Sequence, residues 1–134
     1  MPMNISNFRV EPADYNADFA DLRAIREAVF VIEQHIPENI EFDVIDRNCY
    51  HFIARDDQHQ AIGTCRLAPD YKIGRMAVLE SWRNQGVGKA LLLAILEKAR
   101  KLGTSEVTID AQINVVPFYE KFNFLKSANI FTLA

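Results

Sequence analysis

A short stretch that combines glycine with positive charge carries the clearest chemical signal in this sequence. Residues 83–89 read Arg-Asn-Gln-Gly-Val-Gly-Lys, and a long apolar run of helical periodicity follows at once. The first N–H groups of a helix have no intrahelical acceptor and lie at the positive end of the helix dipole, so they bind phosphate groups. Gly86 and Gly88 have no side chain that would keep a ligand away from the backbone. The stretch therefore predicts a phosphate-binding turn at a helix start.

Two common phosphate-binding motifs do not match this turn. A P-loop requires Gly-x-x-x-x-Gly-Lys followed by Ser or Thr, but Arg83 stands at the first glycine position and Ala90 follows Lys89. A dinucleotide-binding motif requires Gly-x-Gly-x-x-Gly, and Leu91 stands where the third glycine belongs. Nucleoside triphosphate and dinucleotide chemistry are therefore both disfavoured.

The composition limits the class of protein. The chain has 134 residues, of which 49% are hydrophobic and 25% charged, so we expect one globular domain that spans residues 1–134. The net charge of −3 disfavours a dedicated nucleic-acid-binding protein. No apolar run approaches the length of a membrane helix, and no charged leader with an apolar signal core is present. With only Cys49 and Cys65, we expect free thiols, although a disulfide is an alternative, and a cytoplasmic location.

The hydrophobic pattern predicts strands and helices on both sides of the phosphate-binding turn. Gly63, inside a predicted strand, is expected to mark a β-bulge or a close backbone approach. Arg26, between the apolar positions of the first helix, is expected to stay in water. The acidic connection 37–48 is either a solvated loop or a rim that attracts a cationic acceptor. The predicted strands cover residues 7–10, 49–54, 60–67, 71–79, 106–111 and 124–133, the last as one strand or two, and the predicted helices cover residues 19–33, the apolar run up to Gly103, and residues 115–122.

Three segments, in the expected order, resemble the GNAT superfamily of N-acetyltransferases. Arg83–Gly88, after the strand Ile73–Val78, resembles its acetyl-CoA motif. Phe118–Phe124 resembles its tyrosine-containing helix with the strand that follows, and Val29–Gln34 resembles its ElaA-like group. The resemblance implies a mixed α/β (α+β) fold with a central twisted sheet of about six strands and helices on both faces.

The resemblance also implies a further C-terminal strand after Ala134, where the sequence stops. Three explanations stay open: a sheet that lacks its last strand, an edge supplied by a neighbouring molecule, or a truncated chain. An uncovered edge strand invites pairing, so a homodimer is one expectation.

The resemblance implies acetyl-CoA as co-substrate, no metal, and a set of cofactor-binding residues. The N–H groups of residues 83–89 would hold the pyrophosphate, with added charge from Arg83 and Lys89. The edge of the strand at residues 76–78 would pair with the pantetheine arm and hold the thioester oxygen. Gln112, where many family members have Asn, and Asn114 would contact the pantetheine. The complete set is Met76, Ala77, Val78, Arg83, Asn84, Gln85, Gly86, Val87, Gly88, Lys89, Gln112, Asn114 and Tyr119.

The resemblance gives Tyr119 the role of general acid that protonates the departing CoA thiolate, and the alternative is a hydrogen-bonded core tyrosine. For the general base, Glu33 ranks before His51, and each has a structural alternative. Arg66 either pairs with a substrate carboxylate or with an acidic residue of its own chain.

The sequence thus predicts an N-acetyltransferase that acts by direct attack in a ternary complex, on a small-molecule or peptide amine, with neither nucleic acid nor a membrane as partner. The alternative is a non-catalytic acyl-CoA-binding or interaction module on the same fold.

Overall fold

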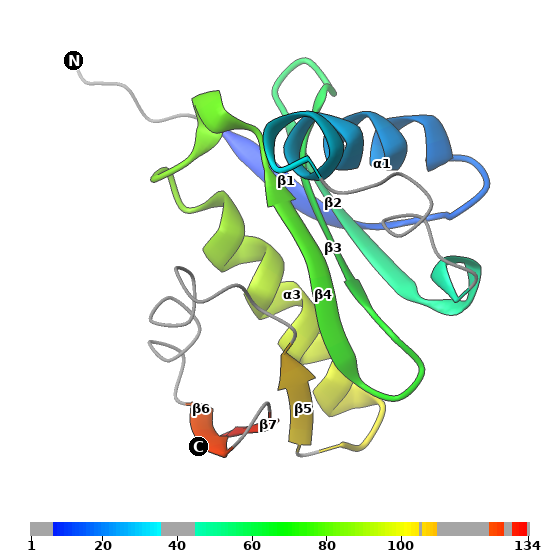
Figure 1. The fold of residues 1–134 in the computed structure, drawn as a ribbon, viewed down its shortest axis with the longest axis vertical. Helices are drawn as coiled ribbons and strands as arrows, with labels where there is room; N and C mark the ends of the chain where they lie inside the picture. The colour runs from blue at the N-terminus through cyan, green and yellow to red at the C-terminus, as the bar shows by residue number, and fades with distance from the viewer. Residues whose placement is uncertain (1–6, 36–44, 105, 110–123, 128–129, 134) are drawn as a thin grey trace.

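The structure is a computed structural model, and it describes residues 7–35, 45–104, 106–109, 124–127 and 130–133. These residues form one mixed sheet with helices on both of its faces (Figure 1). The strands are β1 (Phe8–Ala13), β2 (Tyr50–Asp56), β3 (Ala61–Leu67), β4 (Lys72–Val78), β5 (Glu106–Ile109), β6 (Phe124–Ser127) and β7 (Ile130–Leu133). The helical segments are α1 (Phe19–Arg26), the π-helical η1 (Glu27–Glu33), the short 3₁₀ turns η2 (Asp46–Asn48) and η3 (Glu80–Trp82), and α3 (Val87–Lys101).

The sheet has seven strands in the order β1-β2-β3-β4-β5-β7-β6. The mixed α/β class is therefore confirmed, whereas the expectation of about six strands with the last one missing is wrong. Of the two alternatives for residues 124–133, the structure shows two strands, β6 and β7, which pair antiparallel with each other. β7 also pairs antiparallel with β5, through Val107 and Phe131.

The two faces of the sheet have separate hydrophobic cores. On one face, Ile25 and Val29 from α1 and η1 pack with Ala77 of β4. On the other face, α3 packs its apolar side against β2 to β5 with residues such as Leu91 and Ile95. Figure 1 shows α1 in front of the sheet and α3 behind it, so each helix covers its own face.

The first strand is longer than predicted and contains a proline. β1 runs on to Ala13, and Pro12, predicted to begin a turn, pairs with Phe52 of β2. Proline has no N–H to donate, but β1 lies at the edge of the sheet, where a missing donor on the outer side costs no hydrogen bond.

Gly63 lies where α3 comes closest to the sheet. A Cβ atom on this residue would be 3.1 Å from the carbonyl oxygen of Ala77 and 3.1 Å from side-chain atoms of both Val87 and Leu91. The register between β2 and β3 also shifts opposite this part of β3. The expectation of a bulge or a close approach at Gly63 is thus confirmed, and the close approach fixes the first turn of α3 against β3.

A β-bulge interrupts the pairing of β4 with β3. Thr64 pairs with Ala77 and Arg66 with Gly74, so the single residue Cys65 lies opposite two residues of β4. Arg75, one of the two, has a φ of 49°, in the left-handed region. The described pairing of β4 with β5 joins Lys72 to Thr108 and Ile73 to Ile109, the last described residue of β5. No helix in the described part of the chain is long and apolar enough to span a membrane.

Candidate active site

The predicted phosphate-binding turn is a helix start whose first N–H groups have no acceptor within the helix. α3 begins at Val87, and its first intrahelical hydrogen bond runs from the N–H of Ala90 to the carbonyl of Gly86, at 3.0 Å. The N–H groups of residues 87–89 precede that bond and so have no intrahelical acceptor. Gly86 has a φ of 89°, and a Cβ atom built on it meets no other atom within 4 Å. A ligand can therefore approach these donors over Gly86.

Arg83 has a different environment from the predicted one. Its backbone N–H donates to the carbonyl of Glu80 at 3.3 Å, so this group is not among the open donors, contrary to the expectation for residues 83–89. Its guanidinium donates from Nε to the carbonyl of Val78 at 2.9 Å. It also donates from Nη1 and Nη2 to the two carboxylate oxygens of Glu33, at 2.8 and 2.7 Å. Arg83 thus connects the phosphate-binding turn to the end of β4 and to η1.

The same pair determines the chemistry of Glu33. The hydrogen bonds from Arg83 hold the pKa of the Glu33 carboxyl below its ordinary value. Both oxygens already accept hydrogen bonds, and a lower pKa makes a weaker proton acceptor. The role of Glu33 as general base stays a prediction, and its bidentate pair with Arg83 argues for a positioning role instead.

Of the β4 residues predicted to bind pantetheine, Met76 belongs to the bulge, and Ala77 and Val78 follow it. On their β3 side, Ala77 pairs with Thr64 and Val78 with Gly63. On the side of β5, the described pairing joins Ile73 to Ile109, which is the last described residue of that strand. An extended ligand bound along residues 76–78 would pair with their amides as an added strand does.

A buried polar cluster lies on the α1 face of the sheet. The carboxylate of Asp46 is 1% exposed and accepts hydrogen bonds from Arg26, at 2.9 Å to both oxygens, and from Arg66, at 2.9 Å. The hydroxyl of Tyr15 also donates to it, at 2.9 Å. Burial alone would raise the pKa of the Asp46 carboxyl, but the attraction of Arg26 and the hydrogen bond from Arg66 outweigh burial and lower it. Asp46 therefore stays ionised at neutral pH.

Two expectations from the sequence are corrected by this cluster. Arg26, expected to stay in water, is 1% exposed, and Asp46 lies in the interior although it belongs to the acidic connection. The burial of Arg26 follows from helical spacing. Arg26 lies four residues after Leu22 and three before Val29, so it shares the buried face of the helix with these two apolar residues. For Arg66, the structure shows a pair with an acidic residue of its own chain.

His51 belongs to the same cluster. Its Nε2 lies 2.8 Å from the backbone carbonyl of Asp46, and because a carbonyl only accepts, Nε2 carries the hydrogen. Burial lowers the pKa of the ring, and the positive charges of Arg26 and Arg66 add to that effect. The side chain is 2% exposed, so the neutral imidazole is enclosed on the α1 side of the sheet. Its role as a general base stays a prediction.

Several predicted residues lie outside the described part of the chain. These are Tyr119, Gln112, Asn114 and the predicted helix 115–122. Within the described residues, Cys49 and Cys65 are free thiols, as expected, and burial raises the pKa of Cys65. No group of three or more His, Cys, Asp or Glu side chains in those residues is arranged to hold a metal ion.

Comparison with known proteins decides the family. A model of the acetyltransferase (GNAT) domain matches residues 13–132. The chain belongs to this family. The uncharacterized N-acetyltransferase YjcF of Bacillus subtilis (strain 168) is 34% identical over 102 residues, which are 75% of this chain and 73% of that protein. With the family shown, the chain is an acyltransferase.

Two solved structures agree with this fold. Escherichia coli ElaA superposes with a TM-score of 0.78 at 22% identity, over 93% of this chain and 97% of that one. A GNAT family acetyltransferase from Brucella melitensis, in complex with acetyl-CoA, superposes with a TM-score of 0.72 at 18% identity, over 96% of this chain and 88% of that one. At these identities the likeness concerns the fold.

Proposed function

We propose that this acyltransferase moves an acetyl group from acetyl-CoA to the primary amine of a small molecule or peptide. The amine attacks the thioester carbonyl directly within a ternary complex, the C–N bond forms, and the C–S bond breaks to release CoA. One observation carries the proposal: Arg83 donates to the carbonyl of Val78 at 2.9 Å, so the start of α3, where N–H groups lack intrahelical acceptors, lies next to the end of β4. An anionic group and an extended arm, joined as in acetyl-CoA, suit these two neighbouring surfaces.

The residues of the chain have distinct roles in this proposal. The N–H groups of residues 87–89 hold the pyrophosphate, while Asn84, Gln85 and Lys89 line its approach. The amides of Met76–Val78 orient the pantetheine arm and hold the thioester oxygen. Gln112 and Asn114 contact the same arm. Tyr119 donates its hydroxyl proton to the departing thiolate, since thiols titrate near pKa 8.5 and leave more readily when protonated.

We propose that solvent takes the proton that the amine loses. Glu33 is engaged by Arg83 and His51 is enclosed, so neither is open to an acceptor in the described part of the structure. The pH–rate profile tests this assignment. Replacing either side chain by Gln leaves the acidic limb of the profile in place if water accepts the proton, and removes that limb for a true general base.

The non-catalytic alternative rests on the point that a fold does not fix function. The expectation of a missing last strand no longer adds to it, because β7 pairs with β5. A single domain over residues 1–134, a cytoplasmic location and a homodimer remain proposals, as does a cationic acceptor attracted by the acidic residues of the 37–48 connection.

The test is calorimetric titration of the purified chain with acetyl-CoA, CoA and ATP, followed by a thiol-release screen over primary amines. Saturable binding of both CoA compounds, without ATP binding, supports the proposed cofactor site. Absence of CoA binding would overturn the proposal at its first step.

The role of Tyr119 is tested by Tyr119→Phe, which keeps the ring and removes the hydroxyl. If the tyrosine is the general acid, kcat falls by about 10²-fold or more while the Kd for acetyl-CoA changes little. An unchanged kcat would remove Tyr119 from the mechanism and leave the rest of the proposal intact.

A further inference from the structure

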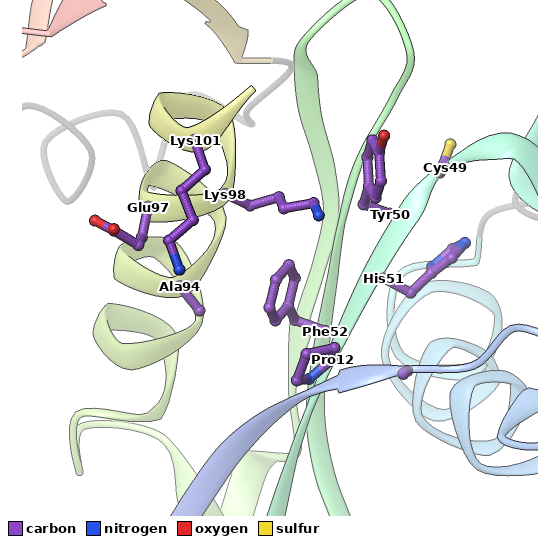
Figure 2. A pocket seen from close by; sticks show the side chains of 10 residues that line it. Pro12, Cys49, Tyr50, His51, Phe52, Ala94, Glu97, Lys98 and Lys101 are labelled. Atoms are coloured by element: carbon purple, nitrogen blue, oxygen red, sulfur yellow. The ribbon is translucent and has the colours of Figure 1, made fainter. Parts of the chain in front are cut away.

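A cavity lies on the α3 face of the sheet, away from the phosphate-binding turn. It measures about 440 Å³ and lies between the C-terminal half of α3, the end of β1 and the start of β2. Figure 2 shows Tyr50 and Phe52 reaching into it from β2, whereas His51 between them points to the opposite face of the sheet. The volume lies within the range of about 300–1,000 Å³ for small-molecule sites.

The cavity has an apolar floor and an aromatic wall. Phe52 is 8% exposed and joins the core, with Ala94 of α3 packed against the same cluster. Tyr50, in contrast, is the first residue of β2, opposite Leu67 at the end of β3, and is 41% exposed. A flat apolar group fits between this ring and the side of α3.

The rim on the helix side carries positive charge. Lys98 places Nζ 4.6 Å from the centre of the Tyr50 ring, and Figure 2 shows its side chain crossing from α3 to β2. Glu97, the one acidic residue of the lining, pairs with Arg100 at 3.0 Å and turns away from the cavity in Figure 2. Neither Lys98 nor Lys101 has a carboxylate partner among the residues that the structure describes.

The helix dipole accounts for only part of this arrangement. Cations near the C-terminal end of α3 complement the negative end of its dipole, wherever they point. The contact of Lys98 with the Tyr50 ring is a cation–π interaction, which accounts for the direction of that side chain. Neither effect accounts for the hollow beside two lysines that lack a carboxylate partner among the described residues. An anionic ligand suits this hollow, because its charge pairs with the lysines and its body fills the space.

We propose that this cavity binds a small organic anion with a flat apolar body, of the class of aromatic carboxylates. The carboxylate pairs with Lys98 and Lys101, and the ring lies between Tyr50 and the α3 backbone over Phe52. The site is separate from acetyl transfer, because Lys98 follows the start of α3 by 11 residues and so lies about 16 Å along the helix axis from the phosphate-binding turn.

The test is a titration of the full chain with 2-naphthoate, monitored through the NMR chemical shifts of backbone amides and side chains. The neutral 2-naphthylmethanol serves as a ligand of matched shape. We expect saturable binding of 2-naphthoate, with the largest shift changes at Tyr50, Phe52 and Ala94. The alcohol should bind with an affinity at least about fivefold lower than that of 2-naphthoate. Saturating acetyl-CoA leaves the 2-naphthoate affinity unchanged.

Two matched substitutions on α3 separate the cavity from general surface charge. Lys98→Met removes one positive charge at the cavity and is expected to weaken 2-naphthoate binding by about fivefold. Arg100→Met removes the same charge from the neighbouring side of the helix and is expected to change binding by less than about twofold. Tyr50→Ala, which removes the aromatic wall, is expected to weaken the binding of 2-naphthoate and of 2-naphthylmethanol to the same extent.

Four results would overturn the proposal. They are the absence of saturable binding, shifts centred on the start of α3, an equal loss from Arg100→Met, and displacement of 2-naphthoate by acetyl-CoA. The last result would place the anion in the transfer site instead.

Discussion

At the scale of single residues, the pair of Glu33 and Arg83 shows how the structure changes a functional interpretation. The sequence places a carboxylate at the end of the first helix and an arginine in the phosphate-binding turn, and each suggests a direct role. The structure joins them through two hydrogen bonds of 2.7 and 2.8 Å. A bidentate pair restricts both side chains and uses their hydrogen-bonding groups. Each residue therefore holds the other in position, and neither is free to bind a ligand directly while the pair is formed.

This pair leads to a prediction about Glu33→Gln. Gln cannot neutralise Arg83 or pair with both of its terminal nitrogens as a carboxylate does, so the turn loses its connection to η1. We expect the Kd for acetyl-CoA to rise about threefold to tenfold with a smaller effect on kcat, as measured by calorimetry and steady-state kinetics.

Glu27→Gln is the matched control, because Glu27 also lies in η1 and also pairs with an arginine, Arg23, at 3.1 Å. Arg23 lies one turn earlier, in α1, and not in the phosphate-binding turn. Glu27→Gln should leave the Kd for acetyl-CoA unchanged. A loss of kcat alone in Glu33→Gln, with the acidic limb of the pH–rate profile gone, would instead make Glu33 the base.

At the scale of secondary-structure elements, the contact of α3 with β3 fixes where the phosphate-binding turn lies. Gly63 permits that contact because a side chain there would meet a backbone oxygen and two core side chains at 3.1 Å. We expect Gly63→Ala to lower the free energy of unfolding by about 1–3 kcal/mol through overpacking. Urea denaturation measures this value.

Gly74→Ala provides the control for that substitution, since Gly74 lies in the adjacent strand β4 and a Cβ atom there meets nothing within 4 Å. Its effect should be well below that of Gly63→Ala. Equal effects would mean that loss of glycine in a strand, and not the contact with α3, causes the destabilisation.

The elements also show what a sequence can and cannot predict. The strand–turn–helix around Gly86 is local, since a strand pattern, two glycines and an apolar helix follow one another, and its prediction is confirmed within a residue or two. The β4 bulge depends on pairing with β3, and the order of β6 and β7 depends on which strand meets β5. Such non-local pairing leaves no mark within either segment alone, and the same is true of the pair between Glu33 and Arg83, 50 residues apart.

At the scale of the whole molecule, Asp46 connects segments that are far apart in the sequence. Its carboxylate holds Arg26 of α1, Arg66 of β3 and Tyr15 before α1, and its carbonyl accepts from His51 of β2. Asp46→Asn keeps the shape but leaves two buried guanidinium groups without this carboxylate. We expect a loss of about 3–5 kcal/mol in the free energy of unfolding, as for other broken buried ion pairs, measured by urea denaturation. Asp56→Asn, at the exposed β2–β3 turn, should cost far less.

The same cluster predicts how stability depends on pH. Burial lowers the pKa of His51 in the folded chain, helped by Arg26 and Arg66 and opposed by Asp46, while in the unfolded chain the ring titrates near pKa ~6.5. Below that pH the unfolded chain takes up a proton that the folded chain does not, until the pH reaches the lower folded pKa. In this window the unfolded state binds more protons, so stability falls as the pH falls, by at most about 1.4 kcal/mol per pH unit.

Urea denaturation at pH 7.5 and at intervals down to pH 5 measures that slope, and His51→Gln identifies its origin. Gln can still donate to the carbonyl of Asp46 but does not titrate, so the decline that begins near pH ~6.5 should become shallower even if the variant is less stable throughout. If His51→Gln retained the slope of the parent chain, the ring would not be the group that takes up the proton on unfolding. The carboxylate of Asp46 cannot cause a slope in this range, because its pKa is lowered and its contribution is lost only at a lower pH.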